Sequence, residues 1–285
     1  MDKKILITID TEALPARASD NHVEKLIWGR FENGRAGIIE ICDVIEEFGG
    51  KGLFFLDVAG SFNNLAAYRE VNSYLERRGH MVEWHYHPEI MGKAFWMERG
   101  ASGTTMRQDL FDAHDANIIL SAGLEQFIKI TGRKPNAYRA GSFRWNQHSI
   151  DFLAKHDIAY SFNACRETAV KDNYETYIPE NPMIFDWPQG VREVPCGEVK
   201  VDDGTVHFRF PRRFTNGITP VGLAEKLASE SGGLVNILLH SWSLLARDED
   251  TGHFFYKDDA RLESFRKILR DLAPRMKLAS GLAAC

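Results

Sequence analysis

The stretch RAGIIEICDVIEEFGGKGLFFLDV, residues 35–58, carries two structural patterns in direct succession. In its first part Ile38, Ile41, Ile45 and Phe48 recur at helical spacing, and the glycines that follow suit the end of a helix. Its second part is a short apolar and aromatic run that is typical of a buried strand. A helix followed at once by a buried strand is the repeating unit of an α/β fold.

The same alternation extends along most of the chain. We expect Asn146 and Thr219 to cap helices, with Pro220 at the first helical position. Alternating strands and helices predict a mostly parallel sheet, either open or closed into a barrel. The patterns predict strands at residues 4–10, 52–58, 80–87, 137–143, 158–163, 192–197 and 234–241, and helices at 35–50, 105–132, 146–156, 219–230 and 258–273.

Residues 165–233 interrupt this alternation of strands and helices. The segment is rich in charge, proline and glycine, and it contains the run VKVDDGTVHFRF at 199–210, in which Asp203-Gly204 is a turn signal for a hairpin. Long loops in a compact domain usually cover or shape a site. We therefore expect one domain over residues 1–285, with an irregular loop and hairpin insertion at about 165–233.

The composition narrows the class of protein. Of 285 residues, 44% are hydrophobic and 26% are charged, which is usual for a soluble globular protein. The formal net charge of -5 gives no basic excess that would favour nucleic acid or an anionic membrane as a partner. No run of 18 apolar residues occurs, so a membrane-spanning helix of ordinary length is not expected.

The N-terminus and the cysteines favour a cytoplasmic location. No apolar signal region with a small-residue cleavage site follows the first residues, MDKKILITID. Cys42, Cys165, Cys196 and Cys285 are far apart in the sequence and form no CxxC motif. We interpret them as reduced thiols of a cytosolic protein.

Two histidines lie close together in the run EWHYHPEI, residues 83–90. Residues two apart in a strand project from the same face. His85 and His87 would therefore lie side by side if extended, where two imidazoles could share one metal ion. An HxH pair also occurs by chance in many proteins, so the motif alone does not decide the matter.

Other polar residues lie at predicted strand ends. Asp10 and Glu12 form another such pair at the end of the first strand, and His240 ends the last one. A strand-end carboxylate is often solvated, and a single histidine is often a hydrogen-bonded core residue. The C-terminal strand ends carry the site in parallel α/β folds, however. Two histidines and one carboxylate with positions open for water are a usual catalytic arrangement for zinc or a similar divalent ion.

Two further stretches fit such a site. The run YRAGSFRWN puts Arg139 at another strand end, where a guanidinium could pair with a carboxylate and hold it ionised, or form a structural ion pair. The run FDWPQGVREVP contains Asp186, Trp187 and Pro188. An aromatic residue beside a proline could line a pocket for an apolar group such as a methyl, although a tryptophan that anchors a loop is as common.

In order, TIDTE, GHMVEWHYHP, YRAGSF, DWP and ILLHS resemble the five motifs of the polysaccharide deacetylase family, carbohydrate esterase family 4, with the NodB-homology fold. The resemblance covers about residues 5–242. It implies a distorted (β/α) barrel of seven or eight strands, similar to a TIM barrel. It also implies that Asp10 is the general base and that Glu12, His85 and His87 bind the metal.

The remaining roles follow from the same resemblance. Arg139 would orient Asp10, Trp187 with Pro188 would line the acyl pocket, and His240 would be the general acid with Asp186 as its partner. The chain departs from the common pattern in two places. Thr11 stands where the first motif usually has a second aspartate, and the histidines are two apart instead of four. The HxHP form resembles one branch of the family.

The resemblance implies a metal-dependent hydrolase that removes an N-acetyl group from an amino sugar. The expected cofactor is one divalent ion, Zn²⁺ first and Co²⁺, Ni²⁺ or Fe²⁺ as alternatives. A cytoplasmic enzyme would act on an intermediate of surface-polysaccharide assembly, such as lipopolysaccharide O-antigen. The alternatives are a metal-independent amidohydrolase of the same fold, a non-catalytic carbohydrate-binding protein, and a glycoside hydrolase using Asp10 and Glu12, which would leave the histidines without a role.

Overall fold

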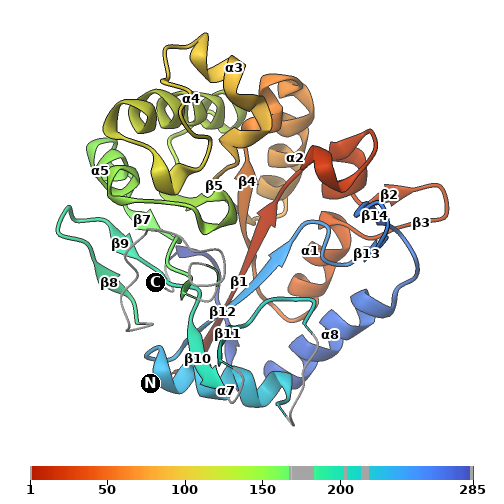
Figure 1. Cartoon of the computed structure of the whole chain (residues 1–285). Helices are drawn as coiled ribbons and strands as arrows, with labels where there is room; N and C mark the ends of the chain where they lie inside the picture. The colour runs from red at the N-terminus through yellow and green to blue at the C-terminus, as the bar shows by residue number, and fades with distance from the viewer. Residues whose placement is uncertain (1, 167, 169–182, 202–203, 213–217, 283–284) are drawn as a thin grey trace. The chain divides into compact units, whose positions relative to one another are not determined.

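The computed structural model describes residues 2–166, 168, 183–201, 204–212, 218–282 and 285 (Figure 1). The chain divides into two compact units, which are described separately. The first unit comprises Met1–Phe54, Arg78–Met81 and Phe208–Cys285, and the second comprises Phe55–Arg77 and Val82–His207.

The strands of the main sheet pair in the order β12-β1-β4-β5-β6-β7-β9-β8, with β15 beside β1. The pairs β1–β12, β1–β15, β5–β6, β6–β7 and β7–β9 are parallel, and β8–β9 is antiparallel. Two strands, β4 (Leu53–Asp57) and β5 (Met81–Tyr86), begin in the first unit and end in the second. The sheet is therefore mostly parallel, as the sequence predicts.

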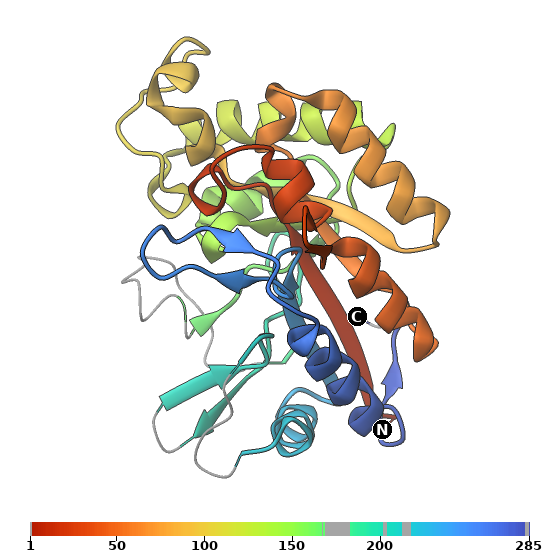
Figure 2. The ribbon, with the colours of Figure 1, turned by 90° about the vertical axis from the view of Figure 1, so that its right-hand side faces the viewer.

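The first unit is built around β1 and β12, which lie side by side in register from Lys4 with Leu234 to Asp10 with His240 (Figure 2). All residues of β1 after Lys4 are buried, as expected for a strand covered on both faces of a parallel sheet. Helix α8 contacts both α1 and α7, and α7 contacts β12. The elements of this unit are β1 (Lys4–Thr11), a 3-10 helix (Pro15–Arg17), a π-helix (Val23–Ile27), β2 (Arg30–Phe31), β3 (Gly34–Arg35), α1 (Ile38–Glu47), α7 (Pro220–Glu230), β12 (Leu234–His240), β13 (Ala246–Arg247), β14 (Phe254–Phe255), α8 (Ala260–Leu272) and β15 (Lys277–Leu278).

The second unit has an aromatic core beneath a row of helices. Trp84 of β5 packs on Tyr138 of β6 with ring centroids 4.4 Å apart, and Phe152 of α5 lies against Trp84. Helix α4 contacts both α2 and α5 (Figure 1). The elements are 3-10 helices at Ala59–Phe62, Pro88–Met91, Gln108–Leu110 and Gly141–Phe143, with α2 (Leu65–Arg77), α3 (Gly92–Met97), α4 (Ala113–Thr131), β6 (Ala137–Ala140), α5 (Gln147–Lys155), β7 (Tyr160–Ser161), β8 (Phe185–Asp186), β9 (Arg192–Glu193), β10 (Glu198–Val201) and β11 (Gly204–His207).

The predicted elements form, but several boundaries differ. The strand expected over 137–143 ends at Ala140, where a 3-10 helix follows, and the strand expected over 192–197 ends at Glu193. The helix expected over 105–132 begins only at Ala113, because the Asp112 side chain accepts a hydrogen bond from Asp115 N at 2.8 Å and caps it there. Asn146 and Thr219 cap α5 and α7 as expected. Helix α2 was not predicted.

The irregular segment at 165–233 also contains regular structure. Strands β8 and β9 belong to the main sheet, and β10 pairs with β11 as the expected hairpin. Of the expected turn Asp203-Gly204, the first residue lies outside the described residues. Among the described helices, none has the length and apolar character that crossing a membrane requires.

Candidate active site

A cluster of two carboxylates and one imidazole lies at the C-terminal ends of β1 and β12. Asp10 stands opposite His240 in the register, and Glu12 follows two residues later. Possible metal-binding atoms of Asp10, Glu12 and His240 lie within 4.8 Å of one another. Asp10 and Glu12 are buried and His240 is partly exposed. The structure thus brings His240 together with two carboxylates from the other end of the sequence.

The turn after β12 fixes these strand ends. Ser241 N donates to the Asp10 carbonyl at 2.8 Å, and the Ser241 hydroxyl accepts from Glu12 N at 3.2 Å. The Ser243 hydroxyl accepts from His240 N at 2.8 Å. The two serines therefore position the backbone of all three residues of the cluster.

Aromatic and cationic groups surround the same cluster. The His240 ring stacks on Trp242, with centroids 4.1 Å apart and planes 20° apart. The guanidinium of Arg17 lies 5.5 Å from the Trp242 ring centroid. Burial and the nearby Arg247 lower the pKa of Arg17, while the charge of Glu12 raises it. Sequence reasoning missed Arg17, which lies in a short 3-10 helix rather than at a strand end.

The second unit holds the histidine pair at the end of β5. The rings of His85 and His87 lie with centroids 5.0 Å apart and planes 81° apart, and both side chains are buried. Nδ1 of His85 lies 2.8 Å from the carbonyl oxygen of Arg139. A carbonyl only accepts, so Nδ1 carries the proton and Nε2 carries the lone pair that binds a metal in such tautomers.

His87 has the same tautomer for a different reason. Its Nδ1 lies 2.7 Å from a carboxylate oxygen of Glu89. Burial alone would raise the pKa of Glu89, but the hydrogen bond and the charge interaction with His87 outweigh it and lower that pKa. An ionised Glu89 accepts the Nδ1 proton, which is the arrangement that orients histidine ligands in metal sites.

Two residues that support the histidines were not singled out from the sequence. The buried carboxylate of Asp57, at the end of β4, accepts from His87 N at 3.0 Å and from Ala59 N at 3.2 Å. Glu89 lies two residues after His87. Both could have been found, Asp57 because it is a charged residue at the end of the predicted strand 52–58, and Glu89 from its i+2 spacing.

The strand end of β6 packs against the histidines. Arg139 is buried, with its guanidinium 4.2 Å from the Phe55 ring centroid, and its Nε donates to the Phe162 carbonyl at 3.4 Å. At Gly141 an added Cβ would lie 2.5 Å from Nδ1 of His87. The glycine is therefore needed for the close approach of the His87 ring. The expected pairing of Arg139 with Asp10 stays a prediction.

The three residues of the DWP motif differ in exposure. Trp187 is buried, donates from Nε1 to Glu193 at 3.1 Å, and packs against Trp145 with centroids 5.3 Å apart. Asp186 and Pro188 are exposed. The described partner of Asp186 is Arg192, at 2.9 Å from Nε to Oδ1. Their roles at an acyl pocket stay predictions.

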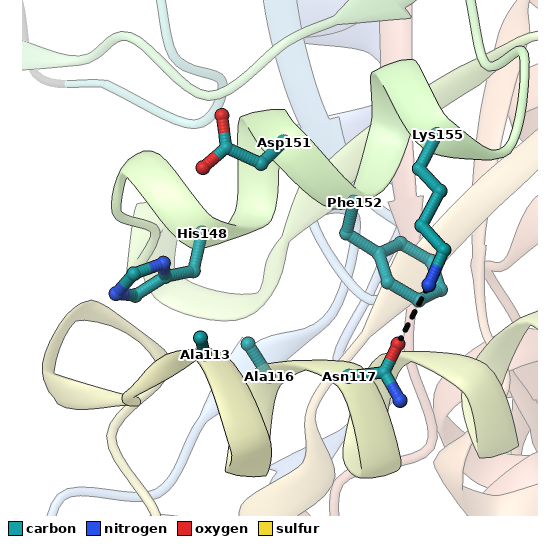
Figure 3. A pocket seen from close by; sticks show the side chains of 7 residues that line it. All are labelled: Ala113, Ala116, Asn117, His148, Asp151, Phe152 and Lys155. Carbon is teal, nitrogen blue, oxygen red and sulfur yellow. Dashed lines mark hydrogen bonds between the residues drawn. The ribbon is translucent and has the colours of Figure 1, made fainter.

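A separate cavity of about 160 Å³ lies between α4 and α5. Figure 3 shows Lys155 of α5 reaching Asn117 of α4, with Nζ 3.4 Å from Oδ1. His148 and Asp151 also line the cavity. Its lining residues include none of the predicted site residues, so this cavity belongs to the packing of two helices.

The donor chemistry of both clusters suits a divalent transition metal. Imidazole nitrogens and carboxylate oxygens are ligands that zinc, cobalt, nickel and iron accept. The partners of His85 and His87 favour the tautomer that presents Nε2 to a metal. Glu12 belongs to the first unit and the histidines to the second. That these three bind one ion stays a prediction.

Comparison with known proteins identifies the fold family. No family model and no curated protein matches the chain. A proposed polysaccharide deacetylase from Mycobacterium smegmatis is similar in structure, with a TM-score of 0.55 and 16% sequence identity over 100% of this chain and 89% of that one. The chain has the polysaccharide deacetylase fold. The expected α/β class, a (β/α) barrel of the NodB-homology type, is therefore confirmed.

Weaker similarities are to other proteins of carbohydrate esterase family 4. One is a family 4 carbohydrate esterase from Streptomyces lividans in complex with acetate, with a TM-score of 0.46 and 10% identity over 98% of this chain and 92% of that one. Another is a family 4 pseudoenzyme from Bacillus anthracis, with a TM-score of 0.47 and 10% identity over 98% and 63%.

Proposed function

We propose that this protein is a metal-dependent hydrolase that removes an N-acetyl group from an amino sugar. The observation that carries the proposal is the hydrogen bonding of the histidine pair. Both Nδ1 atoms donate to fixed oxygens, those of Arg139 and Glu89, as metal-binding histidines do. A buried pair held in this tautomer is what a metal hydrolase needs.

The ligand set in this proposal is Glu12, His85 and His87, and the ion is Zn²⁺ first, with Co²⁺, Ni²⁺ or Fe²⁺ as alternatives. Three protein ligands with a position left for water are usual for catalytic zinc. When bound, such an ion polarises an amide carbonyl and lowers the pKa of water. The two-residue spacing of the histidines is that of the HxHP branch of the deacetylases.

The other residues of the cluster supply proton transfer. Asp10 takes the proton from the water that attacks the amide carbonyl. His240 gives a proton to the departing nitrogen, because an amide anion is too poor a leaving group. The two residues stand opposite each other on β1 and β12, so base and acid are held by one pair of strands. Each is expected to contribute about 10²–10⁴-fold to the rate.

The remaining predicted residues position the substrate and the base. Arg139 orients Asp10, and its burial among Phe55, Phe143 and Phe162 would hold the guanidinium in place. Trp187 and Pro188 line the pocket for the acetyl methyl group, and Asp186 assists His240.

The substrate in this proposal is an N-acetylated intermediate of surface-polysaccharide assembly in the cytoplasm, such as a precursor of lipopolysaccharide O-antigen. The chemical class is an amino sugar that carries a nucleotide or a lipid carrier. The choice of a cytoplasmic substrate follows from the cytoplasmic location that the sequence predicts.

An acetate-release assay tests the function. Metal-loaded protein is incubated with N-acetylated sugar nucleotides and, separately, with polymeric N-acetylated glycans. We expect release from the soluble precursors, reduced about 10²–10⁴-fold in Asp10→Asn. Release from polymers alone would refute the substrate class. No release from either, with sugar binding retained in calorimetry, would favour the carbohydrate-binding alternative.

A further inference from the structure

Three potential metal ligands in the second unit, Cys165, Glu198 and His207, have ligand atoms within 4.8 Å of one another, away from the histidine pair in the sequence. Glu198 of β10 stands directly opposite His207 of β11 in the hairpin register. Directly opposite residues share one face of an antiparallel pair, so both side chains project to the same side. Cys165 follows β7 and Cys196 follows β9, and Cys196 N donates to the Ala164 carbonyl at 3.0 Å. Two strand ends and one hairpin thus meet.

The side chains of this cluster are close, and all but the half-buried Glu198 are buried. The Cys165 sulfur lies 3.9 Å from Nδ1 of His207 and 3.9 Å from a carboxylate oxygen of Glu198. An interaction with the Cys196 thiol lowers the pKa of Cys165. Exposed fractions are 0% for Cys165, 2% for Cys196 and 4% for His207. A fully buried cysteine is poorly placed to attack a substrate, which argues against a nucleophilic role.

We propose that Cys165, Cys196, Glu198 and His207 form a structural zinc site. Two thiolates, an imidazole and a carboxylate are ligands that Zn²⁺ accepts in tetrahedral sites. Zinc bonds of about 2.3 Å to sulfur and 2.0–2.1 Å to nitrogen place two such ligands about 3.6 Å apart. The separations of 3.9 Å from the Cys165 sulfur to His207 and Glu198 require shifts of only a few tenths of an ångström to reach that geometry. The Cys196 sulfur, which lies outside the group of ligand atoms within 4.8 Å, must move closer to complete the site.

Backbone contacts already orient part of the cluster. Arg166 N donates to the second carboxylate oxygen of Glu198 at 2.8 Å, which leaves Oε1 as the oxygen toward Cys165. An ion at this position would tie the β10–β11 hairpin to the ends of β7 and β9. Of these elements, β9, β10 and β11 lie in the stretch 165–233, so the site would stabilise this part of the fold. This inference is independent of the proposed hydrolase activity.

Cobalt substitution tests the site in the whole protein. Thiolate ligands give Co²⁺ an intense sulfur-to-metal charge-transfer absorption in the near ultraviolet, which histidine and carboxylate ligands do not produce. We expect this band in the cobalt-loaded wild type and in His85→Ala/His87→Ala, with about one ion per chain bound in that double variant. Cys165→Ser is expected to lose the band. Cys42→Ser removes another buried thiol and is expected to keep it.

The wild-type spectrum alone can overturn the proposal, whether or not the variants fold. A cobalt-loaded wild type without a thiolate band refutes the site. A Cys165–Cys196 disulfide, detected by mass spectrometry of freshly purified protein under non-reducing conditions, refutes it also and identifies a redox pair. Loss of the band in both Cys165→Ser and Cys196→Ser, with retention in Cys42→Ser, supports it.

Discussion

Three histidines lie in or directly beside strand β5, and their roles differ between its two ends. At the start, Nδ1 of His80 accepts a hydrogen bond from Gly52 N at 3.0 Å. At the end, Nδ1 of His85 and of His87 donate to oxygens at 2.8 and 2.7 Å. A ring whose Nδ1 accepts must carry its proton on Nε2, whereas a ring whose Nδ1 donates presents the Nε2 lone pair.

The difference shows that the neighbouring groups, more than the residue type, decide what a buried histidine can do. His80 turns Nε2 toward Glu46, at 3.2 Å, which is a structural contact. The partners of His85 and His87 prepare both rings for a metal. The contrast predicts that substitutions at the two ends of one strand have separate effects, on stability at one end and on metal binding at the other.

The largest effect is expected from removal of one of the rings at the end of the strand. In His87→Ala the proposed ion loses a ligand, and activity in acetate release should fall roughly 10²-fold or more. His80→Asn keeps an acceptor for Gly52 N and should retain both activity and metal. The measurements are kcat and metal content by elemental analysis. Equal losses of kcat and metal in the two variants would show that the two ends of β5 do not differ in metal binding.

The sequence could predict the local part of this site and not the assembled part. His85 and His87 were found because both sit on one strand at i, i+2 spacing, and Asp10 and His240 because both end predicted strands. The Nδ1 partner of His85 could not be read in this way, since the Arg139 carbonyl comes from another strand. The Cys165 cluster was missed for the same reason: its members lie on separate segments, and their distances depend on how β7, β9 and the hairpin fold together.

A large effect on stability is expected at the start of the strand. Burial lowers the pKa of His80 to about 4, with Lys51 and Arg78 acting in the same direction and Glu46 opposing them. The side chain is 0% exposed. The unfolded chain binds a proton near the ordinary value of about 6.5, while the folded protein does so only near 4. Stability therefore is highest above 6.5 and falls as the pH drops toward 4, by at most about 3 kcal/mol.

Urea unfolding across that pH window measures the effect. His80→Asn should flatten the decline relative to the wild type. His114→Asn, at an exposed histidine of α4, should leave the decline unchanged. A His80→Asn curve parallel to the wild-type curve would mean that His80 does not control this acid sensitivity.

A smaller effect is expected from the carboxylate behind His87. Glu89→Gln keeps the shape of the side chain and removes the charge that accepts the Nδ1 proton. Loss of such a partner typically weakens metal binding by about 10–100-fold. Competition with a chelator measures this affinity. Glu70→Gln, at an exposed position of α2, is the control, and an unchanged affinity in Glu89→Gln would show that Glu89 does not orient the ligand.

The smallest effect is expected from Gly141→Ala, which tests how closely the His87 ring is held. A Cβ at this position would lie 2.5 Å from Nδ1 and 2.6 Å from Cγ of His87, so the ring must tilt, which disturbs its hydrogen bond with Glu89. Because a tilt weakens the hydrogen bond without removing either partner, we expect a loss of metal affinity of about tenfold at most, less than in Glu89→Gln. Gly222→Ala, where the new Cβ would meet only the Thr219 hydroxyl at 3.2 Å, is the control in the same chelator assay. If Gly141→Ala binds metal as tightly as the wild type, the His87 ring has room to move, and its fixed orientation is not what sets the end of β5 apart from its start.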